Sequence, residues 1–266
     1  MLLVNGTVLR FTRNIFNKKK PESSVHMSQL QGAAQLAQFE ALLQPNDPTA
    51  TLAAAAHAWP GAVVLSTSFS WEDQIITHLI AKANLPIGLF TLDTGRLFPE
   101  TYSTWTATLE KYQLPITAYY PQAGGLQSYV VANGPNAFYE SVALRQQCCH
   151  IRKVEPLQRA LTGKKIWITG IRAAHSPNRN DMQQLEWDAT HQVVKYHPLL
   201  HWSTEQVTDF IQQHHIPANP LHQKGFVSIG CAPCTRAVKP GEDFRAGRWW
   251  WEDASKKECG LHVHST

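Results

Sequence analysis

The sequence has no apolar run long enough to span a membrane and no recognisable secretory signal. The stretch 1–16 is apolar in places, but Asn5, Arg10, Arg13 and Asn14 interrupt it. Cysteine is scarce too, because the 266 residues contain five, an odd number that disulfides cannot pair completely. A chain of this length can build a core without disulfides. We therefore expect a cytoplasmic protein with reduced thiols and no membrane contact.

A strong excess of one charge is also absent. The chain has 24 Lys and Arg against 20 Asp and Glu, a net charge of +4, which is not the profile of a strong nucleic-acid binder. The basic residues instead form short clusters, most of them near the cysteines or in the C-terminal tail. These clusters are Lys18–Lys20, Arg152-Lys153, Lys164-Lys165, Arg245 with Arg248, and Lys256-Lys257. Small anionic substrates would account for them, and so would a solvated surface.

Several familiar catalytic signatures are missing. The 13 histidines include no His-Glu-x-x-His metal motif. No loop ends in the Gly-Lys-Ser/Thr of a Walker A motif, and no internal repeat or low-complexity segment is evident. Function must therefore be sought in the loops between secondary-structure elements and in the cysteines.

Short apolar strands alternate with helical patterns from residue 62 onward. We expect strands at 62–65, 87–92, 116–120, 165–171 and 193–196. We expect helices at Ser28–Leu43, Ala53–Ala58, Glu72–Ala83, Pro99–Tyr112 and Ser203–His214. This alternation is typical of βαβ units and predicts an α/β fold around a parallel sheet.

The sequence divides into three expected segments. Residues 1–26 lack periodicity, and we interpret them as a disordered or non-native leader, because Met27 opens a more ordinary sequence; a transit peptide is the alternative. Residues 27–222 form the predicted α/β domain for nucleotide binding. Residues 223–266 are rich in loops and form a predicted cysteine-bearing extension.

Three loops follow predicted strands, and parallel sheets bind ligands at those strand ends. Ser66–Ser70 offers hydroxyl and backbone N–H groups at a helix start, which suits a phosphate but equally an ordinary helix cap. Asp93–Gly95 is better explained as a tight turn. Arg172 and the Ser176–Arg179 segment favour an anion clamp, because guanidinium groups match phosphate and sulfate oxygens.

The cysteines form two pairs and a single residue. Cys148 and Cys149 are adjacent, while Cys231 and Cys234 form a C-x-x-C motif, a set that suits a four-thiolate metal or iron–sulfur site. Adjacent cysteines are poorly placed for a mutual disulfide, but each can bind a different iron of a cubane cluster. Zinc sites usually use C-x-x-C twice, and a redox dithiol would require a strand and a helix around the motif.

Cys259 lies close to the C-terminus among basic residues and histidines. Neighbouring cations favour the thiolate, which is the nucleophilic form of cysteine. The nearby groups are Lys256, Lys257, His262 and His264. We interpret Cys259 as a catalytic nucleophile on a tail, and we expect Trp249–Trp251 to anchor that tail by burial.

Taken in order, these segments resemble the assimilatory adenosine 5′-phosphosulfate reductases, the cluster-bearing branch of the APS/PAPS reductase family. The similarity covers roughly Leu65 to His262. It rests on Ser-Thr-Ser-Phe-Ser, Leu-Asp-Thr-Gly, Cys-Cys-His-Ile-Arg-Lys-Val-Glu-Pro-Leu, Thr-Gly-Ile-Arg, Ser-Pro-Asn-Arg, Gly-Cys-Ala-Pro-Cys-Thr-Arg, Arg-Ala-Gly-Arg-Trp-Trp-Trp-Glu and Glu-Cys-Gly-Leu-His. The Cys-Cys and C-x-x-C set is specific to the cluster-bearing branch, whereas the terminal motif is shared with the cluster-free branch.

The resemblance implies a thioredoxin-dependent reduction of adenosine 5′-phosphosulfate to sulfite and AMP, within sulfate assimilation and cysteine biosynthesis. It implies an S-sulfonate intermediate on Cys259 and an adenine nucleotide alpha hydrolase-like fold with a modified pyrophosphate loop. The implied ligands of a 4Fe–4S cluster are Cys148, Cys149, Cys231 and Cys234. The implied substrate-binding residues are Ser66, Ser68, Phe69, Ser70, Lys153, Arg172, Arg245 and Arg248. Lys153 would lie between cluster and phosphosulfate.

Some alternatives stay open at this point. A preference for the 3′-phosphorylated nucleotide, or use of both nucleotides, is one of them. An ATP-dependent tRNA thiolation enzyme would need a pyrophosphate loop rich in glycine, whereas Trp71 and serines stand here. A zinc-stabilised binding module is a non-enzymatic possibility. The oligomeric state, including a homo-oligomer, is also open.

Overall fold

The computed structural model describes residues 22–173 and 182–253 and contains a six-stranded sheet. The strands are β1 (Val63–Ser66), β2 (Gly88–Leu92), β3 (Ile116–Tyr119), β4 (Ile166–Ile168), β5 (Leu185–Asp188) and β6 (Val193–Tyr196). Their order is β3-β2-β1-β4-β6-β5, with every neighbouring pair parallel except the antiparallel pair of β5 and β6. The predicted α/β fold with its parallel sheet is confirmed, and β5 adds an antiparallel edge.

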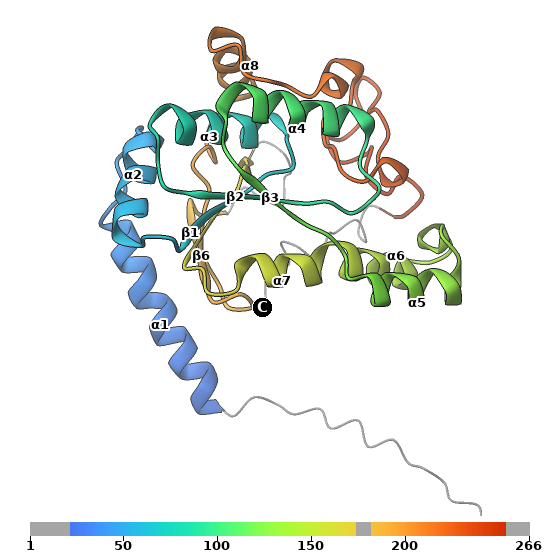
Figure 1. Cartoon of the computed structure of the whole chain (residues 1–266), viewed down its shortest axis with the longest axis horizontal. Helices are drawn as coiled ribbons and strands as arrows, with labels where there is room; N and C mark the ends of the chain where they lie inside the picture. Colours follow the sequence, from blue (N-terminus) through green and yellow to red (C-terminus); the bar gives the residue numbers. More distant parts are fainter. Residues whose placement is uncertain (1–21, 174–181, 254–266) are drawn as a thin grey trace, which may run out of the picture.

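Helices cover both faces of this sheet (Figure 1). They are α1 (Glu22–Glu40), α2 (Pro48–Ala58), α3 (Trp71–Lys82), α4 (Pro99–Tyr112), α5 (Ala123–Asn133), α6 (Val142–Cys149), α7 (Glu155–Leu161) and α8 (Thr204–Gln213). Helices α3, α4 and α8 lie on one side of the sheet, and α5, α6 and α7 lie on the other. No helix among the described residues combines the length and the apolar character needed to cross a membrane.

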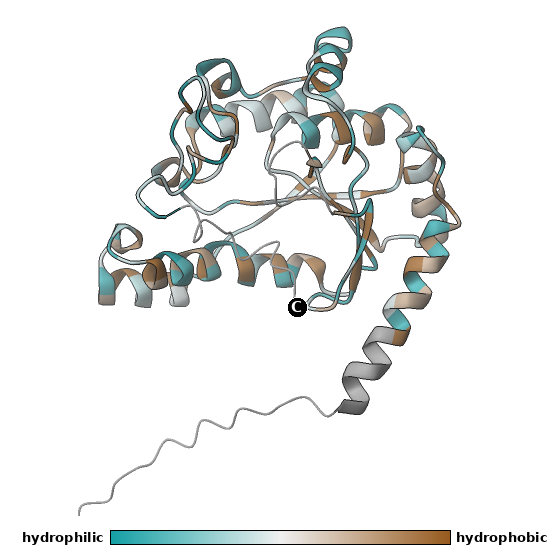
Figure 2. Ribbon diagram, turned by 180° about the vertical axis from the view of Figure 1, so that it is seen from behind, coloured by the Kyte–Doolittle hydropathy of each residue, from teal (hydrophilic) through white to brown (hydrophobic). Residues whose placement is uncertain are grey.

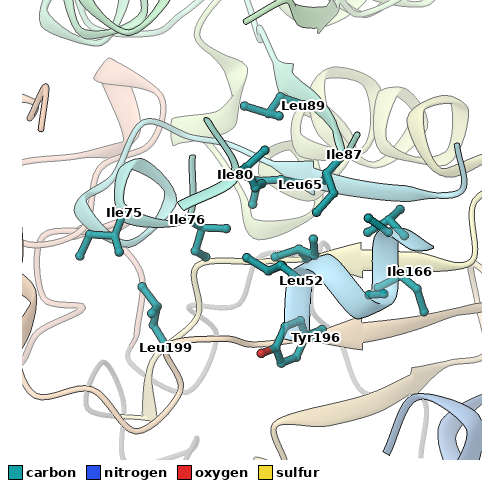
Figure 3. Packing of buried hydrophobic residues seen from close by; sticks show 14 of the residues in the cluster. Leu52, Leu65, Ile75, Ile76, Ile80, Ile87, Leu89, Ile166, Tyr196 and Leu199 are labelled. Carbon is teal, nitrogen blue, oxygen red and sulfur yellow. The ribbon is translucent and has the colours of Figure 1, made fainter. Parts of the chain in front are cut away.

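Two apolar clusters hold these layers together. The larger one joins α2, α3 and α8 to side chains such as Leu65 and Ile168 on one face of the sheet, and Figure 3 shows its central residues. The smaller one packs Leu157 and Leu161 of α7 against Val64 and Trp167 on the opposite face. Figure 2 shows hydrophobic residues along the strands and mixed colouring along the helices, as expected for a sheet buried between amphipathic layers.

Most predicted elements lie where the sequence placed them, with shifted ends. The helix predicted at Ser28–Leu43 runs from Glu22 to Glu40. Its start was predicted too late, because the helical backbone begins before the apolar stripe on which the prediction depends. Strand β4 is shorter than the predicted 165–171, since the chain leaves the sheet after Ile168 and turns toward α3. Ser203 caps α8, and Gln206 completes a capping box.

A continuous helical rod from α6 to α7 was not predicted. Between these helices His150–Val154 forms a π-helical turn, in which the Glu155 N–H donates to the carbonyl of His150 five residues back. Pro156 explains the widening, because proline has no N–H for the Arg152 carbonyl and its ring clashes with that carbonyl in a regular helix. The turn carries Arg152 and Lys153 into the site.

Candidate active site

A cavity of about 280 Å³ lies at the carboxyl ends of β1 and β4. The chain runs from β1 outward to β2 and β3, whereas β4, β6 and β5 lie on the other side of β1, so the strand order reverses here. Such a reversal leaves a crevice beyond the strand ends and is where open α/β sheets bind ligands. The predicted convergence of three loops at the strand ends is observed in part. Ser66–Ser70 lines the cavity throughout, Asp93–Gly95 contributes Thr94, and Gly170–Arg172 contributes Gly170 and Ile171.

The loop Ser66–Ser70 is shaped by a buried carboxylate that the sequence analysis missed. Asp73, in the first turn of α3, accepts hydrogen bonds from the backbone N–H of Ser68 (2.7 Å), from the Ser68 hydroxyl (2.7 Å) and from the Ser70 hydroxyl (3.1 Å). Burial raises the pKa of Asp73 to about 6, although the hydrogen bonds from Ser68 act in the opposite direction. The carboxyl group thus fixes the loop while lining the cavity.

Phe69 is the most constrained residue of this loop. Its φ of 61° lies in the left-handed region that a bulky residue rarely adopts. The side chain is fully buried and stacks on Trp105 of α4 with ring centroids 5.5 Å apart. Its backbone N–H is held by the Thr67 hydroxyl at 3.0 Å. This anchoring turns the neighbouring backbone toward the cavity, as strained loops at binding sites often do.

The segment after β4 approaches α3 closely at Gly170. A Cβ atom there would lie 2.3 Å from Asp73 Oδ1 and 2.9 Å from Glu72 Cβ, so only glycine fits. Arg172 lies just beyond and donates from Nε to Glu72 Oε1 at 2.7 Å, with both side chains buried. Its Nη1 donates to the Trp202 carbonyl at 3.1 Å. Arg172 does not line the cavity, and its predicted contact with substrate stays a prediction.

Asp93–Gly95 forms a tight turn, as the sequence predicted. Asp93 accepts from the Gly95 N–H at 2.8 Å and from the Tyr102 hydroxyl at 2.9 Å. Thr94 lines the cavity, and its carbonyl accepts a hydrogen bond from Arg152. The turn also holds the extension, because the Arg96 carbonyl accepts from the Ala232 N–H of the C-x-x-C motif at 2.8 Å.

The C-terminal extension closes the cavity with cations and an indole. Arg245, Arg248 and Trp249 all line it, and the two guanidinium groups lie 6.0 and 4.8 Å from the Trp249 ring. Trp249 is 1% exposed, which confirms the expected anchoring role for this tryptophan, whereas Trp250 is 40% exposed. The buried Arg248 Nε and Trp249 Nε1 have no hydrogen-bond acceptor within the described residues. Both are donors available to an anionic ligand.

A buried ion pair fastens this extension to the helical rod. Arg145 of α6 donates from Nε and Nη2 to the two carboxylate oxygens of Glu252, at 2.9 and 2.8 Å. Both side chains are at most 4% exposed. The Arg145 guanidinium also lies 4.7 Å from the Trp249 ring centroid. The pair therefore fixes the chain just before the residues that lead to Cys259.

A second, smaller cavity adjoins the first and is lined by the four described cysteines. Cys148 and Cys149 come from the end of α6, and Cys231 and Cys234 from the extension, with Lys153 lining both cavities. The other cations of its lining are Arg96, Arg145 and Arg152. None of the four described cysteines forms a disulfide, and apolar side chains such as Phe138 and Trp249 surround three of them.

The donor set of this cavity fits an iron–sulfur cluster. Its potential ligands are thiols only, and its wall combines apolar side chains with cations. The buried Arg152 Nε has no acceptor within the described residues, so it could donate to a cluster sulfur. In the described residues, no three His, Cys, Asp or Glu side chains are arranged to share one metal ion. A cubane presents a separate iron to each thiolate, so its ligands need not converge on one point.

Charge around the thiols is uneven. Burial raises the pKa of Cys234 to about 12 and also raises that of Cys148. For Cys231 burial acts in the same direction, but Lys153, a hydrogen bond with Thr94 and the nearby arginines outweigh it and lower its pKa. Among Cys148, Cys231 and Cys234, Cys231 is therefore the thiol that the cations favour as a thiolate.

The structure places most predicted site residues together. The larger cavity contains Ser66, Ser68, Phe69, Ser70, Lys153, Arg245 and Arg248. Cys259 and the Ser176–Arg179 segment lie outside the described residues, and their predicted roles stay predictions. Asp73, Trp167 and Trp249 also line the cavity, which the sequence did not predict. Trp167 gave no signal beyond an apolar strand, whereas Asp73 stands in the first helical turn after the hydroxyl-rich loop.

The fold and the cavity define an α/β protein with a cation-lined cavity at a strand-order reversal, beside a second cavity that contains four thiols. Comparison with known proteins agrees. The model of the phosphoadenosine phosphosulfate reductase domain matches residues 62–237. The chain therefore belongs to that family.

Curated relatives and a solved structure support the same family. The adenosine 5′-phosphosulfate reductase of Allochromatium vinosum is 48% identical over 201 residues, which are 76% of this chain and 78% of that protein. The protein of the same name from Agrobacterium fabrum is 43% identical over 243 residues, 91% and 93% of the two chains. The crystal structure of Candida auris phosphoadenylyl-sulfate reductase in a phosphate complex has a TM-score of 0.64 at 24% identity, covers 76% of this chain and 96% of its own, and supports the fold.

Proposed function

We propose that the chain reduces adenosine 5′-phosphosulfate to sulfite and AMP, as an oxidoreductase of sulfate assimilation. The observation that carries this proposal is Lys153, which lines both the cavity at the strand ends and the cavity of the four thiols. An anionic group bound beside Lys153 would touch both sites. The names of the relatives from Allochromatium vinosum and Agrobacterium fabrum supply the substrate.

The larger cavity suits a nucleotide phosphosulfate. Hydroxyl groups of Ser66–Ser70 approach it at the start of α3, where backbone N–H groups and the helix dipole favour negative charge. Lys153, Arg245 and Arg248 supply cations to the lining of the same cavity. Arg172 would join them only by giving up its ion pair with Glu72, so we propose it as a secondary contact.

The chemical step requires a nucleophile that the described residues do not include. We infer that the Cys259 thiolate attacks the sulfur of the phosphosulfate, so an S–S bond forms, the S–O bond to phosphate breaks and AMP leaves. The attacking thiolate and the sulfate are both negative. Lys153, Arg245 and Arg248 offset their repulsion and stabilise the charge that develops on the leaving phosphate.

A second step returns the enzyme to its starting form. A reduced dithiol protein, thioredoxin in our proposal, attacks the Cys259 sulfur of the S-sulfonate and releases sulfite. Its second thiol then resolves the mixed disulfide, leaving Cys259 reduced and the partner oxidised. The dithiol thereby supplies both electrons of the reduction.

We propose that Cys148, Cys149, Cys231 and Cys234 hold a 4Fe–4S cluster. When bound, such a cluster would supply a charged centre next to Lys153 that tunes the field felt by the substrate. The thiol cavity is also lined by cations, which would balance the negative charge of four thiolates. These cations are Arg96, Arg145, Arg152 and Lys153.

The compartment and the division of the chain into segments complete the proposal. We propose the cytoplasm as the compartment, because none of the four described cysteines forms a disulfide. We propose residues 27–222 as the nucleotide-binding domain and 223–266 as an extension that completes its site, since Arg245, Arg248 and Trp249 line the cavity. Residues 1–26 remain a proposed leader.

Sulfite release with reduced thioredoxin tests the proposal directly. We expect turnover of adenosine 5′-phosphosulfate and a lower kcat/KM for the 3′-phosphorylated nucleotide. The matched family domain and the Candida auris structure carry the name of the 3′-phosphorylated substrate, so both nucleotides must be compared. Turnover of neither nucleotide would refute the function.

Two variants separate the chemical assignments. Intact mass after mixing with substrate should show one added SO3 group on the wild-type chain and none on Cys259→Ser, so a sulfonated variant would refute Cys259 as nucleophile. Cys231→Ser should lose iron, acid-labile sulfide and brown colour. A colourless wild-type protein with one zinc and no sulfide would refute the cluster.

A further inference from the structure

Ser66 and Trp167 form a hydrogen bond that crosses from β1 to β4 in the cavity wall. The indole Nε1 lies 2.8 Å from Ser66 Oγ, and both residues line the cavity. An indole nitrogen only donates, so the Ser66 oxygen must be the acceptor. The single hydroxyl hydrogen of Ser66 is therefore left to donate elsewhere, and no hydrogen bond from it is formed within the described residues.

The tryptophan is itself held in place from the next strand. Trp167 is 1% exposed, and its neighbour across the β4–β6 ladder is Lys195. The Lys195 ammonium lies 5.1 Å from the Trp167 ring centroid and 2.9 Å from a carboxylate oxygen of Asp188 on β5. A cation over the indole face draws electron density from the ring and makes its N–H a stronger donor.

These contacts form a row across one face of the sheet, from Asp188 through Lys195 and Trp167 to Ser66. The row begins at the edge strand and ends at the ligand cavity. Each member limits the freedom of the next, since Asp188 fixes the ammonium, the ammonium covers the indole and the indole N–H occupies one lone pair of the hydroxyl.

We propose that Trp167 is a positioning residue whose indole N–H makes the Ser66 hydroxyl a fixed hydrogen-bond donor to an anionic oxygen of the bound nucleotide. A free serine hydroxyl can rotate and either donate or accept. Here one acceptor direction is already used, so the group discriminates in favour of ligands that present an acceptor, such as a phosphate oxygen. The inference rests on the proposed function for the identity of the nucleotide.

A double-mutant cycle on AMP binding tests this role without turnover. By titration calorimetry at fixed salt, Ser66→Ala should weaken the AMP Kd about tenfold, the size of one lost hydrogen bond to a charged group. Trp167→Phe keeps an aromatic ring but removes the N–H, and we expect a loss of similar size. The double variant should bind no more than about twofold more weakly than Ser66→Ala, because the two groups act as one unit.

A purely structural role for Trp167 predicts another result. Its loss would then add fully to that of Ser66→Ala, to about a hundredfold. That outcome, or an unchanged Kd for Trp167→Phe beside a weakened Ser66→Ala, overturns the proposal. If Trp167→Phe does not fold, benzothienylalanine at position 167 replaces the N–H by sulfur in the same shape and carries the same expectation.

Trp187→Phe is the matched control. Trp187 lies on β5, packs over Gly32 and has no acceptor for its indole nitrogen within the described residues. Its replacement should leave the AMP Kd within about twofold. A loss equal to that of Trp167→Phe would overturn the proposal. A wild-type protein that binds AMP but releases no sulfite would refute the proposed function and leave this inference standing.

Discussion

Asp73 is a buried carboxyl group whose ionisation costs folding free energy. Its three hydrogen-bond donors come from Ser68 and Ser70, and burial still raises its pKa from 3.8 to about 6. The folded chain therefore binds this proton more tightly than the unfolded chain does. The stabilisation is complete below pH 3.8 and is lost as the pH rises through about 6.

Asp73→Asn removes this titration while keeping the size of the side chain. Between pH 4 and pH 7 the free energy of unfolding of the wild type, relative to that of Asp73→Asn, should fall by about 2 kcal/mol. Urea unfolding across that pH range measures the difference, and contributions from other groups cancel. Asp209→Asn, on the exposed face of α8, is the control for the same change of side chain at a solvated position. A pH-independent difference for Asp73→Asn would contradict the shifted pKa.

At the scale of elements, the end of β4 and the first turn of α3 are in contact through Gly170. A methyl group there meets Asp73 Oδ1 at 2.3 Å and the Asp73 backbone nitrogen at 3.0 Å, so α3 or the strand must move. We expect Gly170→Ala to lower the free energy of unfolding by about 1–3 kcal/mol and to weaken AMP binding.

Gly124→Ala makes the same change in the first turn of α5, where an added Cβ would meet nothing within 4 Å. It should be neutral or stabilise by about 0.5–1 kcal/mol. Urea unfolding and AMP titration of the two variants form the comparison. Equal effects of the two alanines would refute the close approach at Gly170.

The ion pair between Arg145 and Glu252 joins helix α6 to the extension. Glu252→Gln leaves a guanidinium group buried without its carboxylate, and we expect a loss of about 3 kcal/mol or more. Hydrogen exchange should also rise in the backbone of residues 225–252 before it rises in the sheet.

Glu242→Gln is the control for that pair, because Glu242 binds Arg236 within the same extension but at its surface. Solvent screens such a pair, so its loss should change stability little. Similar destabilisation by both glutamines would show that Arg145 has no special role in holding the extension.

The sequence predicted the central elements well, because their apolar periods are clear. Pro99–Tyr112 and 193–196 were predicted with their observed bounds. The edge strand β5 was missed, since its Leu-Glu-Trp-Asp sequence alternates too briefly to distinguish it from a loop. The π-helical turn was missed too, because its cause lies in Pro156 and its effect lies several residues earlier, at Arg152 and Lys153.

The site was predictable wherever a residue type carries its chemistry in the sequence itself. The pairing of Cys148 and Cys149 with Cys231 and Cys234 is one such case, and their common cavity agrees with it. Trp167 and Asp73 were not predictable, because their roles depend on contacts between neighbouring elements. Arg172 shows that residue type alone is not sufficient. Arginine in a loop at a strand end suits anion binding, but this side chain forms an ion pair with Glu72.

At the scale of the whole molecule, two cavities built by different parts of the chain share a wall. The strand ends and α3 build one of them, the helical rod builds much of the other, and the extension completes both. Lys153 lies at this shared wall because the π-helical turn places it there. Cys231 lines both cavities as well, so one ammonium group and one thiol connect the two sites.

Lys153→Met should therefore separate binding of the cofactor from catalysis. The methionine keeps most of the aliphatic stem, so we expect the fold and the iron content to persist. The kcat/KM for adenosine 5′-phosphosulfate should fall by about a hundredfold, the scale of losing one cation that stabilises developing charge.

Lys164→Met is the control, because the Lys164 ammonium donates to the Gly61 carbonyl at 2.9 Å and lies outside both cavities. Unchanged kcat/KM in Lys153→Met would remove Lys153 from the mechanism. A parallel loss of iron would instead assign it to the thiol cavity alone, because the fall in activity would then follow from the missing cofactor.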